Sequence, residues 1–568
     1  MSVFDYKRRE AHTVTVGGIP MGSNYAVRLQ SMTSTSTMDT EASVEQCCRI
    51  AQAGASYVRL TAQGVREAEN MGRIKQELLA RGVDVPLVAD IHFNPRAATA
   101  AAPLVQKVRI NPGNFVDPGR TFRQLEYTDE EYAAEIKKIE AALVPFLQLC
   151  REHGTAVRIG VNHGSLSDRI MSRYGDTPAG MVESAMEFLR VCVAQNFTQV
   201  VISIKASNTV IMVETVRRLV KAMEAENMDF PLHLGVTEAG DGEDGRIKSA
   251  VGIGTLLSEG IGDTIRVSLS EDPELEIPVA KTLADYIASR HDAQPIDGCF
   301  ASGYDYCSPQ RRQSVAVGNI GGSNQPVVIV DDQGDFEAGL VPDYDNGVAL
   351  VADGRFVEVD AATDVNSVKS MLTADKVVVL YSNHKNVTGH MQAWLHRAMV
   401  AGLTNPVILR VDYGNADAED VAIMAAADLG TMLLNGFADG VWIRAARLTA
   451  VEIARYSFAI LQAARLRITR TEYISCPSCG RTLFDLQATL KEVKAATSHL
   501  KGLKIGVMGC IVNGPGEMAD ADYGYVGAAM GKVSLYKGKE CVEKNIPANE
   551  AISHLIALIK QSGDWKDE

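Results

Sequence analysis

Short apolar runs rich in Val and Ile alternate with longer stretches of helical periodicity over residues 1–288. Such runs predict strands, and apolar residues spaced three or four apart predict helices. The predicted helices include Ser43–Ala53, Thr128–His153, Pro178–Gln195 and Asn208–Glu226. The predicted strands are Val27–Met32, Tyr57–Ala62, Pro86–His92, Lys107–Asn111, Ala156–Asn162, Val200–Ala206, Pro231–Glu238 and Thr264–Leu269. Strands and helices alternating in this order predict an α/β fold, a (β/α)8 TIM barrel.

Polar and charged residues stand near the carboxyl ends of these apolar strands. Asp90 and His92 are two residues apart, which places both side chains on one face of their strand. The carboxyl ends of barrel strands surround the active site, and a charge in a packed core is costly without a partner. The set comprises Arg59, Asp90, His92, Arg109, Asn111, Arg158, Asn162, Ser203, Lys205, Glu238, Arg266 and Ser268.

Basic residues outnumber acidic ones in this set. Its acids are Asp90 and Glu238, and its bases are Arg59, Arg109, Arg158, Lys205 and Arg266. Arginine forks bind phosphate oxygens in pairs, and lysine adds a point charge. Glycine-rich segments follow the seventh strand, at 238–245 and 251–254, where barrels often bind phosphate. The pattern predicts a site for a multiply charged anion.

Residues 289–452 form a second α/β segment of different character. Its strands lack the repeated late Arg and Lys, so we interpret it as an inserted scaffold domain resembling a partial barrel. Cys299 and Cys307 have no recognised metal-binding spacing. The predicted strands are Val327–Asp331, Val377–Tyr381, Pro406–Val411 and Gly440–Ile443, and the predicted helices include Met391–Ala401 and Ala418–Asp428.

Three cysteines near the end of the chain have the spacing of a metal or cluster site. Residues 476–479 read Cys-Pro-Ser-Cys, and residues 509–517 read Gly-Cys-Ile-Val-Asn-Gly-Pro-Gly-Glu. The glycine–proline turn at 514–516 can bring Glu517 back toward Cys510. Residues 453–568 are expected to form an α+β domain with a helix at Leu483–Ser498 and strands at Leu503–Gly509, Tyr523–Val526 and Val533–Lys537.

Several kinds of site contain a Cys-x-x-Cys pair. A structural zinc would need a fourth Cys or His, for which Cys541 is available, and a thioredoxin-like pair would need a different strand–helix setting. The preferred interpretation is a cluster bound by Cys476, Cys479, Cys510 and a fourth ligand that is not a cysteine. Three thiolates can hold a four-iron cluster and leave one iron with an exchangeable position.

The amino-acid composition limits the kinds of molecule that this protein is expected to bind. A formal net charge of -14 argues against nucleic acid, and no run of about 20 apolar residues predicts a membrane span. The amino-terminal segment has no signal-peptide pattern, so we expect a cytoplasmic protein. The ten cysteines suit a reducing compartment, and Cys47, Cys48, Cys150 and Cys192 are expected to be small buried residues.

Together these motifs resemble the 4-hydroxy-3-methylbut-2-enyl diphosphate synthases, iron–sulfur enzymes of the methylerythritol phosphate route. The resemblance covers the barrel and the cysteine region, and the middle segment resembles the insert of the longer, three-domain form. We therefore expect domains at 1–288, 289–452 and 453–568. The motifs are those at 30–33 (QSMT), 89–93 (ADIHF), 109–114 (RINPGN), 158–162 (RIGVN), 235–239 (GVTEA), 476–479 and 509–517.

The resemblance implies a function and a set of site residues. It implies a [4Fe-4S] cluster on Cys476, Cys479, Cys510 and Glu517, and the two-electron reduction of 2-C-methyl-D-erythritol 2,4-cyclodiphosphate. It implies ferredoxin or flavodoxin as electron donor and a cluster domain that caps the barrel, here within one chain, with monomer and homodimer both open. It assigns the diphosphate to Arg59, Arg109, Arg158, Lys205, Arg266 and Ser268, acid–base chemistry to Glu238, and supporting contacts to Asp90, His92, Asn162 and Asn513.

Two other functions are compatible with the residues. A phosphate-binding lyase or aldolase could use Lys205 for a Schiff base and carry a structural zinc in its tail. An electron-transfer or sensing protein could use the barrel only as a scaffold, but the polar residues late in the strands argue against it.

Overall fold

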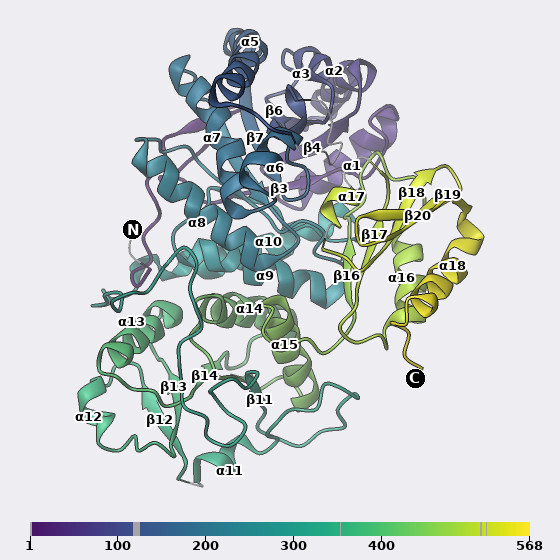
Figure 1. Cartoon of the computed structure of the whole chain (residues 1–568). Helices are drawn as coiled ribbons and strands as arrows, with labels where there is room; N and C mark the ends of the chain where they lie inside the picture. Colours follow the sequence, from purple (N-terminus) through teal and green to yellow (C-terminus); the bar gives the residue numbers. More distant parts are fainter. Residues whose placement is uncertain (1–2, 118–124, 353, 512–513, 519, 568) are drawn as a thin grey trace. The chain divides into compact units, whose positions relative to one another are not determined.

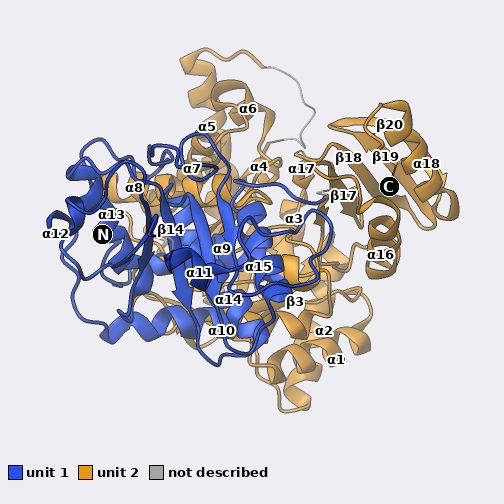
Figure 2. Ribbon diagram, turned by 90° about the horizontal axis from the view of Figure 1, so that it is seen from below, with its two compact units in different colours: residues 1–9, 246–261, 282–470 blue, residues 10–245, 262–281, 471–568 orange. Residues whose placement is uncertain are grey.

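The computed structural model describes residues 3–117, 125–352, 354–511, 514–518 and 520–567. The chain divides into two compact units (Figure 2). Unit 1 comprises residues 1–9, 246–261 and 282–470, and unit 2 comprises residues 10–245, 262–281 and 471–568. Among the described helices, none combines the length and the apolar content that a bilayer crossing requires.

Unit 2 contains the predicted TIM barrel, which is confirmed (Figure 1). The strands are parallel in the order β8-β7-β6-β5-β4-β3-β10-β9, and a parallel bridge from Ile202 to Leu232 closes the ring. They are β3 (Arg28–Met32), β4 (Tyr57–Ala62), β5 (Leu87–Ile91), β6 (Lys107–Ile110), β7 (Ala156–Asn162), β8 (Val200–Lys205), β9 (His233–Leu234) and β10 (Thr264–Ile265).

The last two barrel strands are shorter than predicted. After β9 the chain reaches Glu238, whose φ of 54° lies in the left-handed region and ends any extended run. After β10 the backbone N–H of Leu269 donates to the Glu276 carboxylate at 3.2 Å instead of to a neighbouring strand. The chain therefore leaves the ladder early at the two positions where polar side chains turn toward the barrel mouth.

Helices connect the successive barrel strands along the chain. Thr128 and Glu131 form a capping box at the start of α5, and Gly154 ends that helix with a φ of 67°. A hairpin of β1 (Val14–Val16) and β2 (Ile19–Met21) packs in one apolar cluster with the early strand residues Tyr57 and Ala156. The helices are α1 (Thr40–Gln52), α2 (Val65–Ala80), α3 (Pro95–Ala101), α4 (Pro112–Phe115), α5 (Asp129–His153), α6 (Asp168–Tyr174), α7 (Pro178–Ala194), α8 (Thr209–Ala225), α9 (Gly242–Ser258) and α10 (Glu276–Ala288).

The carboxyl-terminal part of unit 2 is a five-stranded mixed sheet in the order β16-β17-β18-β19-β20. The first three strands are parallel and the last two are antiparallel. Its helix α16 begins at Leu486 rather than Leu483, because Asp485 accepts the Ala488 N–H and caps it. The strands are β16 (Glu472–Ser475), β17 (Lys504–Met508), β18 (Tyr523–Ala529), β19 (Lys532–Lys537) and β20 (Glu540–Pro547), and the helices are α16 (Leu486–Thr497), α17 (Gly514–Glu517) and α18 (Ala548–Gln561).

This sheet contacts the carboxyl end of the barrel within unit 2. Ala239 and Ser475 form a parallel bridge, and the hydroxyl groups of Ser270 and Ser475 lie 2.7 Å apart. A Cβ added to Gly164 would lie 2.0 Å from the carbonyl oxygen of Gly516. The two backbone segments therefore approach each other so closely that neither Gly164 nor Gly516 has room for a side chain.

Unit 1 is built around a five-stranded parallel sheet in the order β11-β15-β14-β13-β12. The strand β12 was not predicted, because it is half exposed and carries polar residues between its apolar ones. The strands are β11 (Val327–Ile329), β12 (Phe356–Asp360), β13 (Val377–Tyr381), β14 (Val407–Asp412) and β15 (Gly440–Arg444), and the helices are α11 (Gly347–Ala352), α12 (Val365–Lys369), α13 (Val387–Val400), α14 (Ala418–Leu434) and α15 (Ala450–Ala463).

Unit 1 also includes most of α9 and the second half of α10, because the residues of these segments contact α14. A Cβ on Gly254 of α9 would lie 2.7 Å from the Cβ of Ala427 in α14, so these two helices pack closely. The guanidinium of Arg290 donates to the Asp428 carboxylate at 2.5 Å, and both side chains are buried. A close helix contact and a buried ion pair thus tie α9 and the segment after α10 to α14.

Replacing Gly164 with Ala tests the contact between the barrel and the carboxyl-terminal sheet. Gly154 is a matched control, because its φ of 67° is similar to the 79° of Gly164 but nothing lies within 4 Å of the Cβ it would gain. We expect G154A to cost about 1–2 kcal/mol of backbone strain. We expect G164A to cost more, seen as a larger drop in the midpoint of thermal unfolding. Equal drops would show that the close approach contributes nothing.

Candidate active site

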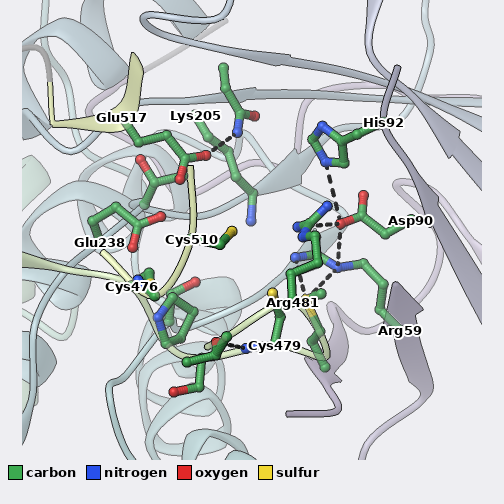
Figure 3. A pocket seen from close by; sticks show the side chains of 18 of the residues that line it. Arg59, Asp90, His92, Lys205, Glu238, Cys476, Cys479, Arg481, Cys510 and Glu517 are labelled. Carbon is green, nitrogen blue, oxygen red and sulfur yellow. Dashed lines mark hydrogen bonds and ion pairs between the residues drawn. The ribbon is translucent and has the colours of Figure 1, made fainter. Parts of the chain in front are cut away.

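Most of the predicted residues of the barrel and of the cysteine region line one cavity within unit 2 (Figure 3). Asn513 lies outside the described residues. Asn111 is directed elsewhere, because its side chain caps α4 by accepting the Gly113 N–H. The predicted residues that line the cavity are Arg59, Asp90, His92, Arg109, Arg158, Asn162, Lys205, Glu238, Arg266, Ser268, Cys476, Cys479, Cys510 and Glu517.

The strand register explains why the barrel residues meet. Asp90 of β5 is opposite Arg109 of β6, which is opposite Arg158 of β7. Asn162 and Lys205 are likewise paired near the ends of β7 and β8. Residues that are partners across parallel strands and point inward lie at one level of the barrel.

Asp90 lies at the centre of a group of arginines. Its carboxylate is 3.1 Å from Arg109, 3.9 Å from Arg59 and 3.8 Å from Arg481. Burial alone would raise the pKa of Asp90, but Arg59, His92 and Arg109 outweigh it and hold the pKa well below its usual value. Burial and Arg109 lower the pKa of His92 to about 3. Asp90 is therefore a carboxylate and His92 a neutral imidazole at physiological pH.

Two cations in the cavity have no counter-ion in the part of the chain that the structure describes. Arg158 is buried, and its Nε and Nη1 atoms have no hydrogen-bond partner. Among the described residues, no carboxylate lies within ion-pair distance of Arg158 or Lys205. Burial and the surrounding arginines hold the pKa of both groups well below their usual values. Two unpartnered buried cations make a bound anion favourable at this point.

Arg266 differs from them, because Glu276 binds it through two nitrogens at distances of 3.0 and 2.9 Å. Ser31 also donates to Glu276, at 2.7 Å. The expectation that Asp90 and Glu238 are the acids of the inner wall was therefore incomplete. Glu276 begins a helix far along the chain, so strand position alone gave no signal of it.

Glu238 occupies a strained position beside a second carboxyl group. Its left-handed backbone, with a φ of 54°, is unusual for a residue with a side chain and typical of functional sites. Burial raises the pKa of Glu238 well above its usual value, and the negative charge of the nearby Glu517 carboxyl group adds to the shift. Glu517 also accepts a 2.7 Å hydrogen bond from Asn162.

The cysteine loops leave one edge of the carboxyl-terminal sheet. Cys476 follows β16 and Cys510 follows β17, and these neighbouring strands are parallel. The φ of 61° at Ser478 makes the tight turn between Cys476 and Cys479. Glu517 ends the short helix α17. Parallel pairing therefore brings together segments that are more than thirty residues apart in the sequence.

The donor set fits an iron–sulfur cluster. Among the described residues, no three His, Cys, Asp or Glu side chains converge closely enough to bind a single metal ion. The ligands of a four-iron cluster bind different iron atoms, so they surround a space instead of meeting at a point. Cys476, Cys479, Cys510 and Glu517 surround the cavity in this manner, and the Gly509 N–H donates to the Cys476 sulfur at 3.3 Å.

Arg481 is the main cavity residue that the sequence reasoning did not identify. It lines the cavity from the carboxyl-terminal sheet, two positions after Cys479. Burial opposes its charge, but Cys479, Asp90 and Cys510 raise the pKa of Arg481 above its usual value. The sequence signal that could have identified Arg481 was its position two residues after the proposed ligand Cys479. The lining then has six basic side chains (Arg59, Arg109, Arg158, Lys205, Arg266 and Arg481) and three carboxyl groups (Asp90, Glu238 and Glu517).

Comparison with known proteins identifies the family. The GcpE TIM-barrel domain matches residues 11–281, and the GcpE protein C-terminal domain matches residues 472–561. A protein of Parabacteroides distasonis named 4-hydroxy-3-methylbut-2-en-1-yl diphosphate synthase (flavodoxin) is 57% identical over 100% of both chains. Proteins of the same name from Porphyromonas gingivalis (100% of both chains) and Protochlamydia amoebophila (99% of this chain and 98% of that one) are 51% and 40% identical. This chain therefore belongs to the GcpE family, the enzyme family of the 4-hydroxy-3-methylbut-2-en-1-yl diphosphate synthases.

Proposed function

We propose that this protein reduces 2-C-methyl-D-erythritol 2,4-cyclodiphosphate to 4-hydroxy-3-methylbut-2-enyl diphosphate, a precursor of isoprenoids. Two electrons enter, the ring C–O bond to phosphate and a C–OH bond break, and a C=C bond forms. The phosphate retains the ring oxygen, and the hydroxyl group takes up one proton and leaves as water. The single observation that supports this proposal most strongly is that the three cysteines and the barrel cations line one cavity.

The cations of the barrel are suited to bind the diphosphate. Arg158 and Lys205 lack counter-ions among the described residues, so an anion between them would regain the electrostatic energy that burial costs. Arg266 is already held by Glu276, which fixes its orientation toward the cavity. We assign the diphosphate to Arg59, Arg109, Arg158, Lys205, Arg266 and Ser268.

We propose that Cys476, Cys479, Cys510 and Glu517 hold a [4Fe-4S] cluster. Such a cluster, when bound, supplies electrons one at a time and a Lewis-acidic iron. A carboxylate is the more exchangeable ligand, because iron–sulfur clusters prefer thiolates. Asn162 donates to Glu517 and so orients its carboxylate.

Glu238 is the proposed acid–base residue. It lines the cavity and its Oε2 atom is buried without a hydrogen-bond partner, so a substrate hydroxyl group can occupy that position. Asp90 and His92 hold the guanidinium of Arg109 in place. We propose supporting contacts with the substrate for Asp90, His92, Asn162 and Asn513.

The remaining assignments are also proposals. The relatives' names include flavodoxin, which we propose as the electron donor, with ferredoxin as the alternative. We propose a cytoplasmic location and a division into a substrate-binding barrel (1–288), a scaffold domain (289–452) and a cluster domain (453–568) that caps the barrel of the same chain. Monomer and homodimer are both compatible with this arrangement.

Anaerobic purification tests the proposal directly. We expect a brown protein that contains about four iron atoms per chain, and reduction of the cyclic diphosphate when a strong one-electron donor is added. Iron content, the visible spectrum and product analysis are the measurements. A colourless zinc protein whose Lys205 is trapped by borohydride with a carbonyl substrate would instead support a barrel lyase.

Replacing Glu517 with Ala tests the fourth ligand. We expect E517A to keep its thermal unfolding midpoint but to lose iron or to show an altered EPR spectrum, because one cluster ligand is missing. Glu540 is an exposed glutamate in the same sheet, and E540A should behave as the unchanged protein does. Normal iron content and spectra in E517A would exclude Glu517 as a ligand.

Replacing Glu238 with Gln tests the acid–base assignment. Glutamine keeps the size and hydrogen-bonding capacity but cannot release a proton. We expect E238Q to retain substrate binding and the cluster spectrum, and to lose about 10²-fold or more in turnover. The control E69Q, on the exposed side of α2, should retain full activity. Undiminished turnover in E238Q would rule Glu238 out as the proton donor.

A further inference from the structure

Arg481 joins the two parts of the active site and has no role in the proposed reaction so far. It comes from the cysteine loop, and its side chain is only 7% exposed. Its guanidinium is 3.8 Å from the Asp90 carboxylate of the barrel. It therefore places a permanent positive charge between the thiol loops and β5.

The charge of Arg481 interacts with the cysteine loops that line the same cavity. Burial opposes this charge, but Cys479, Asp90 and Cys510 favour it and raise the pKa of Arg481 above its usual value. Its Nε and Nη1 atoms are buried without a hydrogen-bond partner. Part of its hydrogen-bonding capacity is therefore left for groups that occupy the cavity it lines.

A cation at this place has a predictable effect on a redox centre. Reduction adds negative charge to a cluster, and a buried positive charge nearby stabilises the reduced state more than the oxidised one. Hydrogen bonds to the ligand sulfurs act in the same direction. Arginine keeps its charge at any physiological pH, so the effect does not depend on protonation.

Asp90 opposes this effect. Its carboxylate lies near Arg481, Arg59 and Arg109 and neutralises part of their charge. Asp90 therefore reduces the positive potential that Arg481 and its neighbouring arginines create at the cysteine loops. Removing Arg481 and removing the charge of Asp90 must then act with opposite signs.

We propose that Arg481 is a positioning residue that raises the reduction potential of the centre bound by Cys476, Cys479, Cys510 and Glu517, and that Asp90 limits the increase. The inference rests on the proposed cluster and extends it, since it assigns the control of electron uptake to one ion pair between the barrel and the cysteine loop. A merely structural contact would have no reason to shift the potential in two directions.

The test is a redox titration of the full-length holoprotein under anaerobic conditions, monitored by EPR and absorbance. We expect R481Q to lower the midpoint potential and R481K, which keeps the charge, to retain most of the original value. We expect D90N to raise the potential. Arg49 pairs with Glu274 at the surface, so R49Q is the control and should leave the potential unchanged.

The outcomes separate this inference from the proposed function. If the protein without any substitution binds no iron, the proposed cluster is wrong. Two other results would contradict this inference and leave the proposed function intact. In the first, the cluster is present and has the same reduction potential in R481Q as in the protein without substitutions; in the second, it has a lower potential in D90N. If R481Q does not retain iron, the D90N variant still tests the inference. Arg481 is intact in D90N, so the reduction potential of the cluster in D90N must rise.

Discussion

The buried excess of positive charge at the carboxyl end of the barrel is the constraint on which the rest of the site depends. Arg158 and Lys205 have no counter-ion among the described residues, and Arg59 and Arg109 share Asp90. Burying such charges weakens folding unless something compensates them. The eight-stranded ring supplies the frame that holds them, and we propose that a bound anion supplies the compensation. This is the pattern of a site that gives up stability for binding.

The carboxyl-terminal sheet contributes to the site because of how its strands are paired. Parallel pairing of β16 and β17 places two cysteine loops at one edge, and the backbones of Gly164 and Gly516 approach so closely that neither position has room for a side chain. Beside this point, Asn162 donates to Glu517 and Arg481 lies near Asp90, so side chains also connect the two parts. The basic residues of the barrel and the three thiol groups therefore line one cavity.

The inserted segment is held within unit 1 by helices that precede it in the chain. Gly254 of α9 packs closely against Ala427 of α14, and Arg290, which follows α10, forms a buried ion pair with Asp428 of α14. The described residues that line the cavity all belong to unit 2. The insertion is therefore stabilised by contacts that do not use the cavity residues.

The sequence by itself determined the barrel, the cation-rich strand ends and the cysteine ligand candidates, because alternation, charge and spacing are local properties of the chain. It did not reveal the edge strand β12, the early ends of β9 and β10, or the roles of Glu276 and Arg481. The roles of Glu276 and Arg481 depend on partners that are not their neighbours along the chain: Glu276 binds Arg266, and Arg481 lies beside Asp90. Only the tertiary structure decided which cations are already paired and which are left for an anion, since pairing is set by distance in space and not by position along the chain.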